Sequence, residues 1–137
     1  MNIFKISILF VFLGTILSCD TPQNTPDKDK ELAATLEVVD CQVFEQLMGK
    51  EEAFLLLDVR TKEEVENGMI DGAMHLDFYS NDFSASLEKL DKNQTVFVYC
   101  AKGGRSNKAA NQMVNLGFSK VYDLDGGFGA WTICQRD

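Results

Sequence analysis

The chain has few positively charged residues and only one histidine, the residue that most often acts as a general base. Its 137 residues include 13 Lys and Arg against 21 Asp and Glu, which gives a formal net charge of −8 at pH 7. Nucleic-acid binding needs a Lys and Arg excess on at least one face, so the composition argues against it. The single histidine, His75, is predicted to be a structural or surface residue rather than a proton shuttle. Any anion site must therefore be local and work without a histidine.

The sequence also lacks an apolar run long enough to cross a bilayer, which takes about 20 residues. The run Ile6–Leu17 is shorter than that and follows one cation, Lys5. It ends at Ser18 and Cys19, a pattern that resembles a bacterial lipobox, in which the cysteine becomes the lipidated first residue. An ordinary signal peptide is the alternative. We expect residues 1–18 to be a lipoprotein-type signal peptide with Cys19 as the lipidation site.

Proline is scarce, and both prolines lie in the segment that follows Cys19. This segment is rich in Asp, Asn, Gln and Lys, and it has too few apolar residues to offset the entropy cost of ordering the chain. We predict that residues 19–35 form a disordered tether. We expect the protein to lie in the bacterial cell envelope, either in the periplasm or anchored to the membrane. Its lipid would be its only contact with the membrane.

The rest of the chain, residues 36–137, alternates between short apolar runs and amphipathic segments. This alternation is typical of one α/β domain with a parallel sheet, and we expect a monomer. Five strands are predicted at 36–39, 53–59, 73–76, 95–99 and 121–124. Helices are predicted at 41–48, 62–67, 83–90, 105–116 and 128–134.

Cys100 follows the buried strand 95–99 and therefore lies at its carboxyl end. Open parallel sheets bind their ligands at this edge. The next helix directs unpaired N–H groups and positive dipole charge at this loop, which favours a thiolate over a thiol. Lys102 and Arg105 add positive charge, while Gly103 and Gly104 let successive amides turn inward around an anion. A buried inert cysteine is the alternative, but the convergence of these features favours a nucleophile.

The segment 100–106 (CAKGGRS) resembles the C-x-x-G-x-R-S active-site loop of the rhodanese-like sulfurtransferases. Two further segments match in order: 58–73 (DVRTKEEVENGMIDGA) resembles DVR…E-x-x-x-G-x-I-x-G-A, and 124–131 (LDGGFGAW) resembles GG-x-x-x-W. The resemblance implies a three-layer fold with strand order 1-5-4-2-3 and helices on both faces. It also implies that Cys100 accepts a sulfane sulfur as a persulfide.

The resemblance assigns roles to the residues that match the motifs. Cys100 is the expected nucleophile, and the expected persulfide-binding residues are Ala101, Lys102, Gly103, Gly104 and Arg105. Supporting roles fall to Asp58, Arg60 and Ser106, although a plain structural ion pair is an equal alternative for Asp58 and Arg60. We expect Arg60 to pair with Glu64. Met69 stands where the family often has histidine, so a hydrogen bond made there by other members is in doubt.

The implied reaction takes sulfur from thiosulfate or a similar anion and passes it to a thiol or to cyanide, with no cofactor. A non-catalytic carrier that presents a persulfide to a partner is the first alternative. A small phosphatase or arsenate reductase is the second, but that chemistry needs a C-x5-R loop, and here only four residues separate Cys100 from Arg105.

Two other cysteines, Cys41 and Cys134, lie in the first and last predicted helices, which share one face in the implied fold. We expect two buried thiols, with a disulfide as the alternative in an oxidising compartment. No zinc site is predicted, because the chain has no C-x-x-C pair and no histidine near a cysteine.

Overall fold

The computed structural model describes residues 34–136, so the predicted signal peptide, Cys19 and nearly all of the predicted tether lie outside the described part. Five parallel strands form one sheet in the order β1-β5-β4-β2-β3. The predicted α/β class and strand order are therefore confirmed. The strands are β1 (Thr35–Val39), β2 (Phe54–Asp58), β3 (Met74–His75), β4 (Thr95–Tyr99) and β5 (Lys120–Leu124).

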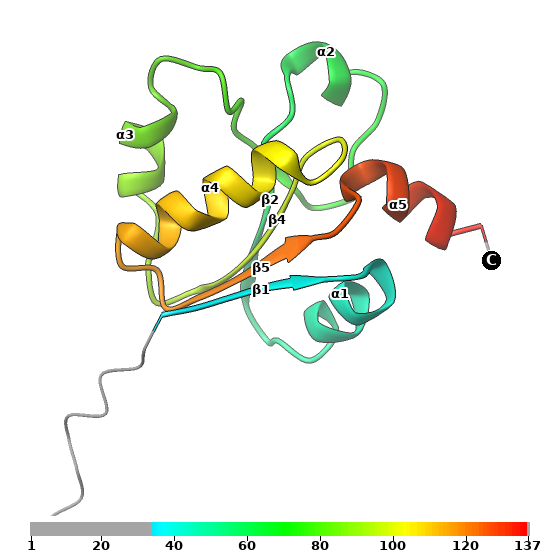
Figure 1. Cartoon of the computed structure of the whole chain (residues 1–137), viewed down its shortest axis with the longest axis horizontal. Helices are drawn as coiled ribbons and strands as arrows, with labels where there is room; N and C mark the ends of the chain where they lie inside the picture. Colours follow the sequence, from blue (N-terminus) through cyan, green and yellow to red (C-terminus); the bar gives the residue numbers. More distant parts are fainter. Residues whose placement is uncertain (1–33, 137) are drawn as a thin grey trace, which may run out of the picture. The chain divides into compact units, whose positions relative to one another are not determined.

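Helices cover both faces of the sheet, which makes three layers (Figure 1). One layer contains α1 (Cys41–Met48) and α5 (Gly127–Cys134), and the opposite layer contains α3 (Phe83–Glu88) and α4 (Gly104–Asn115). The short helix α2 (Lys62–Val65) follows β2 at the carboxyl end of the sheet. Within residues 34–136, no helix has the length and the apolar character needed to cross a membrane.

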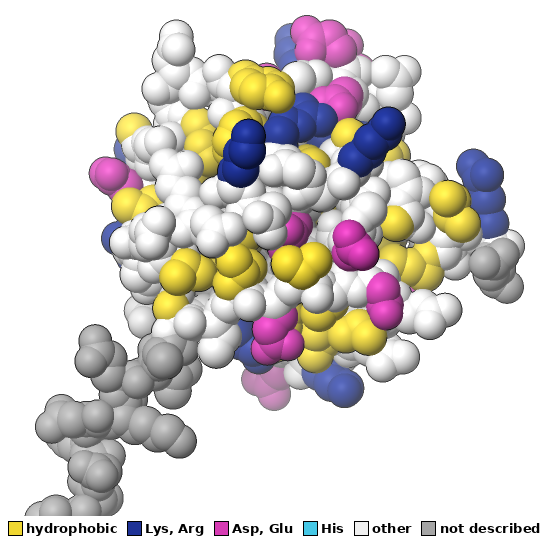
Figure 2. Space-filling view, viewed as in Figure 1, with side chains coloured by type: hydrophobic (Ala, Val, Ile, Leu, Met, Phe, Trp, Pro, Cys, Tyr) yellow, Lys and Arg dark blue, Asp and Glu magenta, His cyan; other side chains and the backbone are white. Residues whose placement is uncertain are grey.

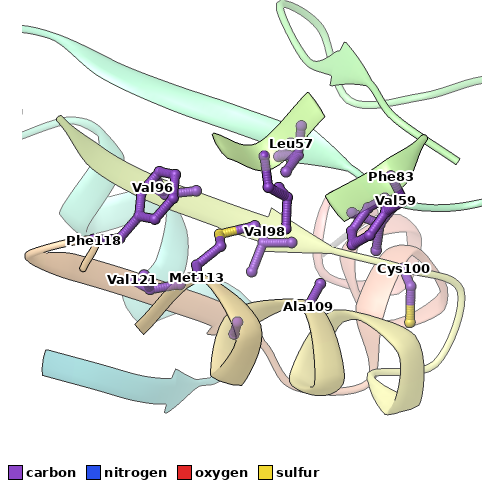
Figure 3. Close-up of a cluster of buried hydrophobic side chains, with 12 residues drawn as sticks. Leu57, Val59, Phe83, Val96, Val98, Cys100, Ala109, Met113, Phe118 and Val121 are labelled. Carbon is purple, nitrogen blue, oxygen red and sulfur yellow. The ribbon is translucent and has the colours of Figure 1, made fainter. Parts of the chain in front are cut away.

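The core is divided by the sheet into two clusters, because successive strand residues point to opposite faces. Val96 and Val98 of β4 face α4, where they meet Ala109 and Met113 (Figure 3). Phe97 faces the other layer and packs edge-on against Phe44 of α1, with ring centroids 5.2 Å apart. Every residue of β4 is buried, as expected for the central strand of a parallel sheet.

Four elements are shorter than the sequence predicts, among them β2, which covers 54–58 rather than 53–59, and α3, which covers 83–88 rather than 83–90. Helix α2 ends at Val65 rather than at residue 67, and Gly68 then adopts a left-handed conformation with φ of +112°. Strand β3 has two residues instead of four, because it lies at the edge of the sheet and pairs only with the end of β2. These short elements leave longer loops around the carboxyl end of β2, beside the start of α4.

Cys41 and Cys134 form a disulfide, so the expectation of two buried thiols is wrong. The bond joins the first residue of α1 to the last residue of α5, which lie in the same layer with their Cα atoms 6.5 Å apart. Sequence alone could not decide this, because disulfide formation depends on a separation that is set by the packing of two helices distant in the chain. The bond closes a loop of 93 residues.

We predict that replacing both cysteines by Ala lowers the free energy of unfolding by about 4 kcal/mol, because a bridge across a loop of this length restricts the unfolded chain. Urea denaturation without reductant measures the difference. As a control, a reductant should destabilise the wild type to a similar extent and leave the double variant unchanged. Equal stability of the two oxidised proteins would contradict the prediction.

Candidate active site

Cys100 lies directly after β4, in the loop that leads into α4, and is 2% exposed. Figure 3 shows it in line with Val96 and Val98, beside Val59. The N–H of Gly103 donates to its Sγ at a distance of 3.1 Å. Gly103 has a φ of +93°, a left-handed conformation that a side chain would strain, and it is the N-cap residue of α4. The sulfur therefore lies beside the amide-bearing end of a twelve-residue helix.

The environment of the sulfur favours the thiolate. Burial acts to raise the pKa of Cys100, but the nearby Ser106 side chain and the backbone amides of Ser106, Lys102 and Arg105 lower it by more. The net pKa of this thiol is below its ordinary value. Backbone donors and the α4 dipole thus favour the thiolate without a histidine.

Arg105 is held by Glu64, which corrects the expected Arg60–Glu64 pair. The two guanidinium NH groups of Arg105 donate to the two carboxylate oxygens of Glu64, each at 2.7 Å. The Arg105 hydrogen bonds lower the pKa of Glu64 to about 2, so Glu64 is ionised at any physiological pH. The pair bridges α4 to α2, where Glu64 also accepts from the Thr61 N–H as part of a capping box.

Because its side chain is paired, Arg105 contributes its amide to the sulfur site, and its charge is balanced by a carboxylate. Lys102 is exposed in the same loop, so its ammonium is the positive group available to an incoming anion. Figure 2 shows Lys and Arg side chains over the start of α4, and Asp and Glu side chains both beside them over α2 and lower on this face, over β1 and β5. The positive site is thus local, as the acidic composition requires.

Asp58 and Arg60 form a buried ion pair with each other. Arg60 Nη2 lies 2.6 Å from Asp58 Oδ2, and both side chains are almost fully buried. Arg60 also donates to the Gly68 carbonyl at 2.7 Å, and its guanidinium lies 3.9 Å from the Phe128 ring centroid. The pair therefore connects the end of β2 to the α2 loop and to α5.

The start of α5 is hydrogen-bonded to the backbone of the Cys100 loop. The N–H of Phe128 donates to the Cys100 carbonyl at 2.7 Å, and the N–H of Gly129 donates to the Ala101 carbonyl at 3.2 Å. Gly127 lies so close that a Cβ on it would stand 2.3 Å from the Cys100 carbonyl oxygen. The absence of a Cβ at Gly127 thus lets α5 approach the loop backbone.

The remaining predicted residues lie nearby. Ser106 is fully buried and donates to the Gly103 carbonyl at 3.0 Å. His75 is half-buried, and its Nε2 lies 2.9 Å from the Arg60 carbonyl oxygen, which fits the structural role predicted for it. Met69 is also half-buried and lines a hollow beside Trp131, on the α1 and α5 side.

Sequence reasoning missed Tyr79 and Asp123. Tyr79 is 68% exposed, and its ring centroid lies 5.6 Å from the Arg105 guanidinium, so it stands at the edge of the site. It lies in a loop without a motif, and no signal pointed to it. Asp123 is 1% exposed and lies within β5, where a charged residue among apolar neighbours was a usable signal.

We predict that Gly127→Ala displaces the Cys100 loop and destabilises the fold by at least about 2 kcal/mol, because the new Cβ meets backbone and the φ of +57° is unfavourable for alanine. Thermal unfolding and the alkylation rate of Cys100 measure the two effects. Gly129→Ala is the matched control, since its Cβ would lie 3.5 Å from the Ala101 carbonyl, an ordinary contact. Similar behaviour of the two variants would contradict the prediction.

Comparison with known proteins agrees with this geometry. The chain is 42% identical over 78 residues to the thiosulfate sulfurtransferase GlpE of Stutzerimonas stutzeri, covering 56% of this chain and 69% of the relative. It is 29% identical over 106 residues to the putative sulfur carrier protein YrkF of Bacillus subtilis, covering 77% of this chain but only 56% of that protein.

The solution structure of the rhodanese-like domain of the Anabaena protein Alr3790 superposes with a TM-score of 0.61 at 32% identity, covering 70% of this chain and 73% of that one. The Rhodanese-like domain family matches residues 40–134, which include every described strand except β1 and the whole Cys100 loop. The chain therefore belongs to the rhodanese-like domain family, in which it has relatives named as sulfurtransferases and as a sulfur carrier.

Proposed function

We propose that this domain is a sulfurtransferase that moves a sulfane sulfur from thiosulfate or a similar anionic donor through a persulfide on Cys100. The observation that carries the proposal is the Gly103 N–H bound to Cys100 Sγ at 3.1 Å, at the start of α4, together with a lowered thiol pKa. Relatives named as sulfurtransferases support the same reaction class.

The reaction needs no external proton. The Cys100 thiolate attacks the outer sulfur of thiosulfate, a bond forms between the two sulfurs, and the bond to the sulfonate breaks to release sulfite. The persulfide anion then occupies the place of the thiolate, where amides from Ala101 to Arg105 stabilise its charge. A thiolate or cyanide attacks the outer sulfur, and Cys100 leaves again as a thiolate. A low thiol pKa helps both steps, since the thiolate is first the nucleophile and finally the leaving group.

The surroundings of the loop suit a small anionic donor. The Lys102 ammonium is exposed beside the loop, while the Arg105 charge is balanced by Glu64, so Lys102 supplies the attraction for the donor. The loop has four residues between Cys100 and Arg105, a size that fits one extra sulfur atom better than a tetrahedral phosphate.

A sulfur carrier is the second candidate, and the relation to YrkF favours it, because that protein is named a putative sulfur carrier. The two candidates share the persulfide on Cys100 and differ in what removes the sulfur. A sulfurtransferase turns over with a small acceptor, whereas a carrier keeps its persulfide until a protein partner takes it.

We also propose that the domain is anchored in the bacterial cell envelope by a lipid on Cys19, with residues 1–18 removed and residues 19–35 acting as a tether. The Cys41–Cys134 disulfide supports an oxidising compartment such as the periplasm. The apolar run that ends at Ser18 and Cys19 supports the lipid.

For the reaction, we predict that thiosulfate adds one sulfur to the peptide containing Cys100 and that cyanide removes it as thiocyanate. Cys100→Ser should abolish both steps with its thermal unfolding retained, because serine is small and cannot form a persulfide. Peptide mass spectrometry and a thiocyanate assay measure the steps, and Cys19→Ser is the matched control that should keep full activity. A stable persulfide that no small acceptor removes would favour the carrier, and hydrolysis of a phosphate ester without any persulfide would overturn the proposal.

For the anchor, we predict that Cys19→Ala releases the chain from membranes when the full-length protein is expressed in a bacterial host, because the acyl chains are its only membrane contact. Detergent phase partitioning and metabolic labelling with a fatty acid measure the effect. Cys100→Ala should remain in the detergent phase with its label. Equal membrane retention of the wild type and Cys19→Ala would contradict the lipid anchor.

A further inference from the structure

The Cys41–Cys134 disulfide borders a surface hollow between the start of α1 and α5. The hollow has a volume of about 490 Å³, and both cysteines line it. Ile133, which also lines it, is 63% exposed, so the hollow is open to solvent. Cys134 is partly exposed, whereas Cys41 is only 7% exposed. A thiol reagent can therefore approach the bond in the folded domain, from the side of Cys134.

The two sulfur atoms lie at helix ends of opposite polarity. Cys41 is the first residue of α1, where the helix carries partial positive charge, and Cys134 is the last residue of α5, where the charge is partial and negative. The Asp40 carboxylate at the start of α1 is already bound to the Val43 N–H. In thiol–disulfide exchange, one sulfur is attacked and the other leaves as a thiolate, so the exchange is faster when the leaving thiolate is stabilised. Exposure and charge thus both favour attack on Cys134 with Cys41 as the leaving group.

Helix α5 connects this disulfide to the Cys100 loop. Cys134 is its last residue, and the Cys100 loop lies at its other end (Figure 1). There the N–H groups of Phe128 and Gly129 donate to the carbonyls of Cys100 and Ala101, at 2.7 and 3.2 Å. A change in the position of α5 therefore acts directly on the backbone of the loop.

The packing of α5 against the rest of the domain is sparse. Of its eight residues only Gly127 is buried. A second hollow, of about 550 Å³, lies beside Trp131, so α5 is bordered by hollows at two places. Trp131 meets the Phe44 ring edge-on, with centroids 6.4 Å apart, and the disulfide adds a covalent link to the same helix, α1. Sparse packing of this kind is typical of segments that open locally, so the disulfide has a large share in holding α5.

We propose that the Cys41–Cys134 disulfide is a second reactive site of this domain, which a dithiol reduces, and that its opening loosens α5 and with it the Cys100 loop. A thiolate of the dithiol attacks Cys134 Sγ, a mixed disulfide forms there, and Cys41 leaves as a thiolate. The second thiol of the reductant then attacks its own sulfur in the mixed disulfide, and Cys134 leaves in turn. The reductant departs as a disulfide, and its two electrons and two protons end on the two cysteines.

The inference goes beyond sulfur transfer, and its tests read bond opening and loop mobility in the full-length chain. Dithiothreitol should reduce the folded protein at a rate proportional to its concentration. A plateau set by the rate of global unfolding would overturn the proposal, because the bond would then open only in the unfolded chain. Loss of the near-ultraviolet circular dichroism on reduction would also overturn it, since the proposal needs a folded reduced form.

The attacked sulfur is identified with a monothiol, which stops the exchange at the mixed disulfide. The full-length chain is treated briefly with 2-mercaptoethanol, quenched with acid and N-ethylmaleimide, and mapped by peptide mass spectrometry. The mercaptoethanol adduct should be on Cys134 and the maleimide on Cys41, in at least about tenfold excess over the reverse pattern. Equal amounts of the two patterns, or an excess of the reverse, would overturn the assignment.

The loosening of α5 is measured by amide hydrogen exchange of the oxidised and reduced wild type in low concentrations of urea. Exchange that does not depend on urea reports local opening, and for Phe128 and Gly129 it should rise at least about tenfold on reduction. The amides of Leu76 and Phe118 are the controls, because they donate to Asp58 and Met113, away from α5. Unchanged exchange at Phe128 and Gly129, or an equal rise at the two controls, would overturn the proposal.

The effect on the loop is read from the alkylation of Cys100, whose side chain is 2% exposed. At about pH 9, reduction of the wild type should speed alkylation of the Cys100 peptide by iodoacetamide at least about fivefold, since a looser loop exposes the sulfur. The double variant Cys41→Ser, Cys134→Ser should show this faster rate with and without dithiothreitol. A rate in the reduced wild type equal to that of the oxidised protein would overturn the proposal.

Phe118→Leu is the matched control for a general loss of stability. Phe118 is fully buried at the opposite end of the sheet from Cys100 (Figure 3), so this change weakens the core and leaves the disulfide and α5 in place. The oxidised Phe118→Leu protein should keep the slow alkylation of Cys100. A rate as fast as in the reduced wild type would overturn the proposal, because any weakening of the fold would then release the loop.

Discussion

The site depends on a close approach between two stretches of backbone, the Cys100 loop and the start of α5. Two amides of α5 donate to the carbonyls of Cys100 and Ala101, and the absence of a Cβ at Gly127 is what allows this distance. Because its carbonyls are bound by α5, the loop can direct its own amides toward the sulfur. Gly103 does so at a φ of +93°. A thiolate without a histidine is possible because this backbone arrangement is already in place before the sulfur ionises.

The charged residues around the loop each have a partner that limits what they can do. Asp58 neutralises Arg60 in the interior, and the pair packs on Phe128 at the start of α5. Glu64 neutralises Arg105 at the edge of the site, which ties α2 to α4 and leaves Lys102 as the exposed cation of the loop. This arrangement lets an acidic protein keep a small positive site without a basic surface.

Most of the fold was predictable because its signals are local. Apolar runs with caps and glycines give β4 at 95–99 as predicted and the other main elements within a residue or two. The strand order and the Cys100 loop followed from the resemblance, since three motifs in sequence order define one arrangement. The lengths of α2 and β3 were wrong, because an edge strand and a helix of one turn are limited by their neighbours more than by their own residues.

Partner choice was the part that sequence reasoning could not supply. Arg60 and Glu64 are four residues apart and look like a pair, yet Arg60 turns inward to Asp58 and Glu64 meets Arg105 from α4. The Cys41–Cys134 bond likewise joins residues from distant elements. The sequence by itself determined the α/β class, the nucleophile candidate and its glycine-rich loop, because each is written in consecutive residues. Only the tertiary structure decided which charges are paired and which cysteines are bonded, since a side-chain contact depends on distances that the packing of separate elements sets.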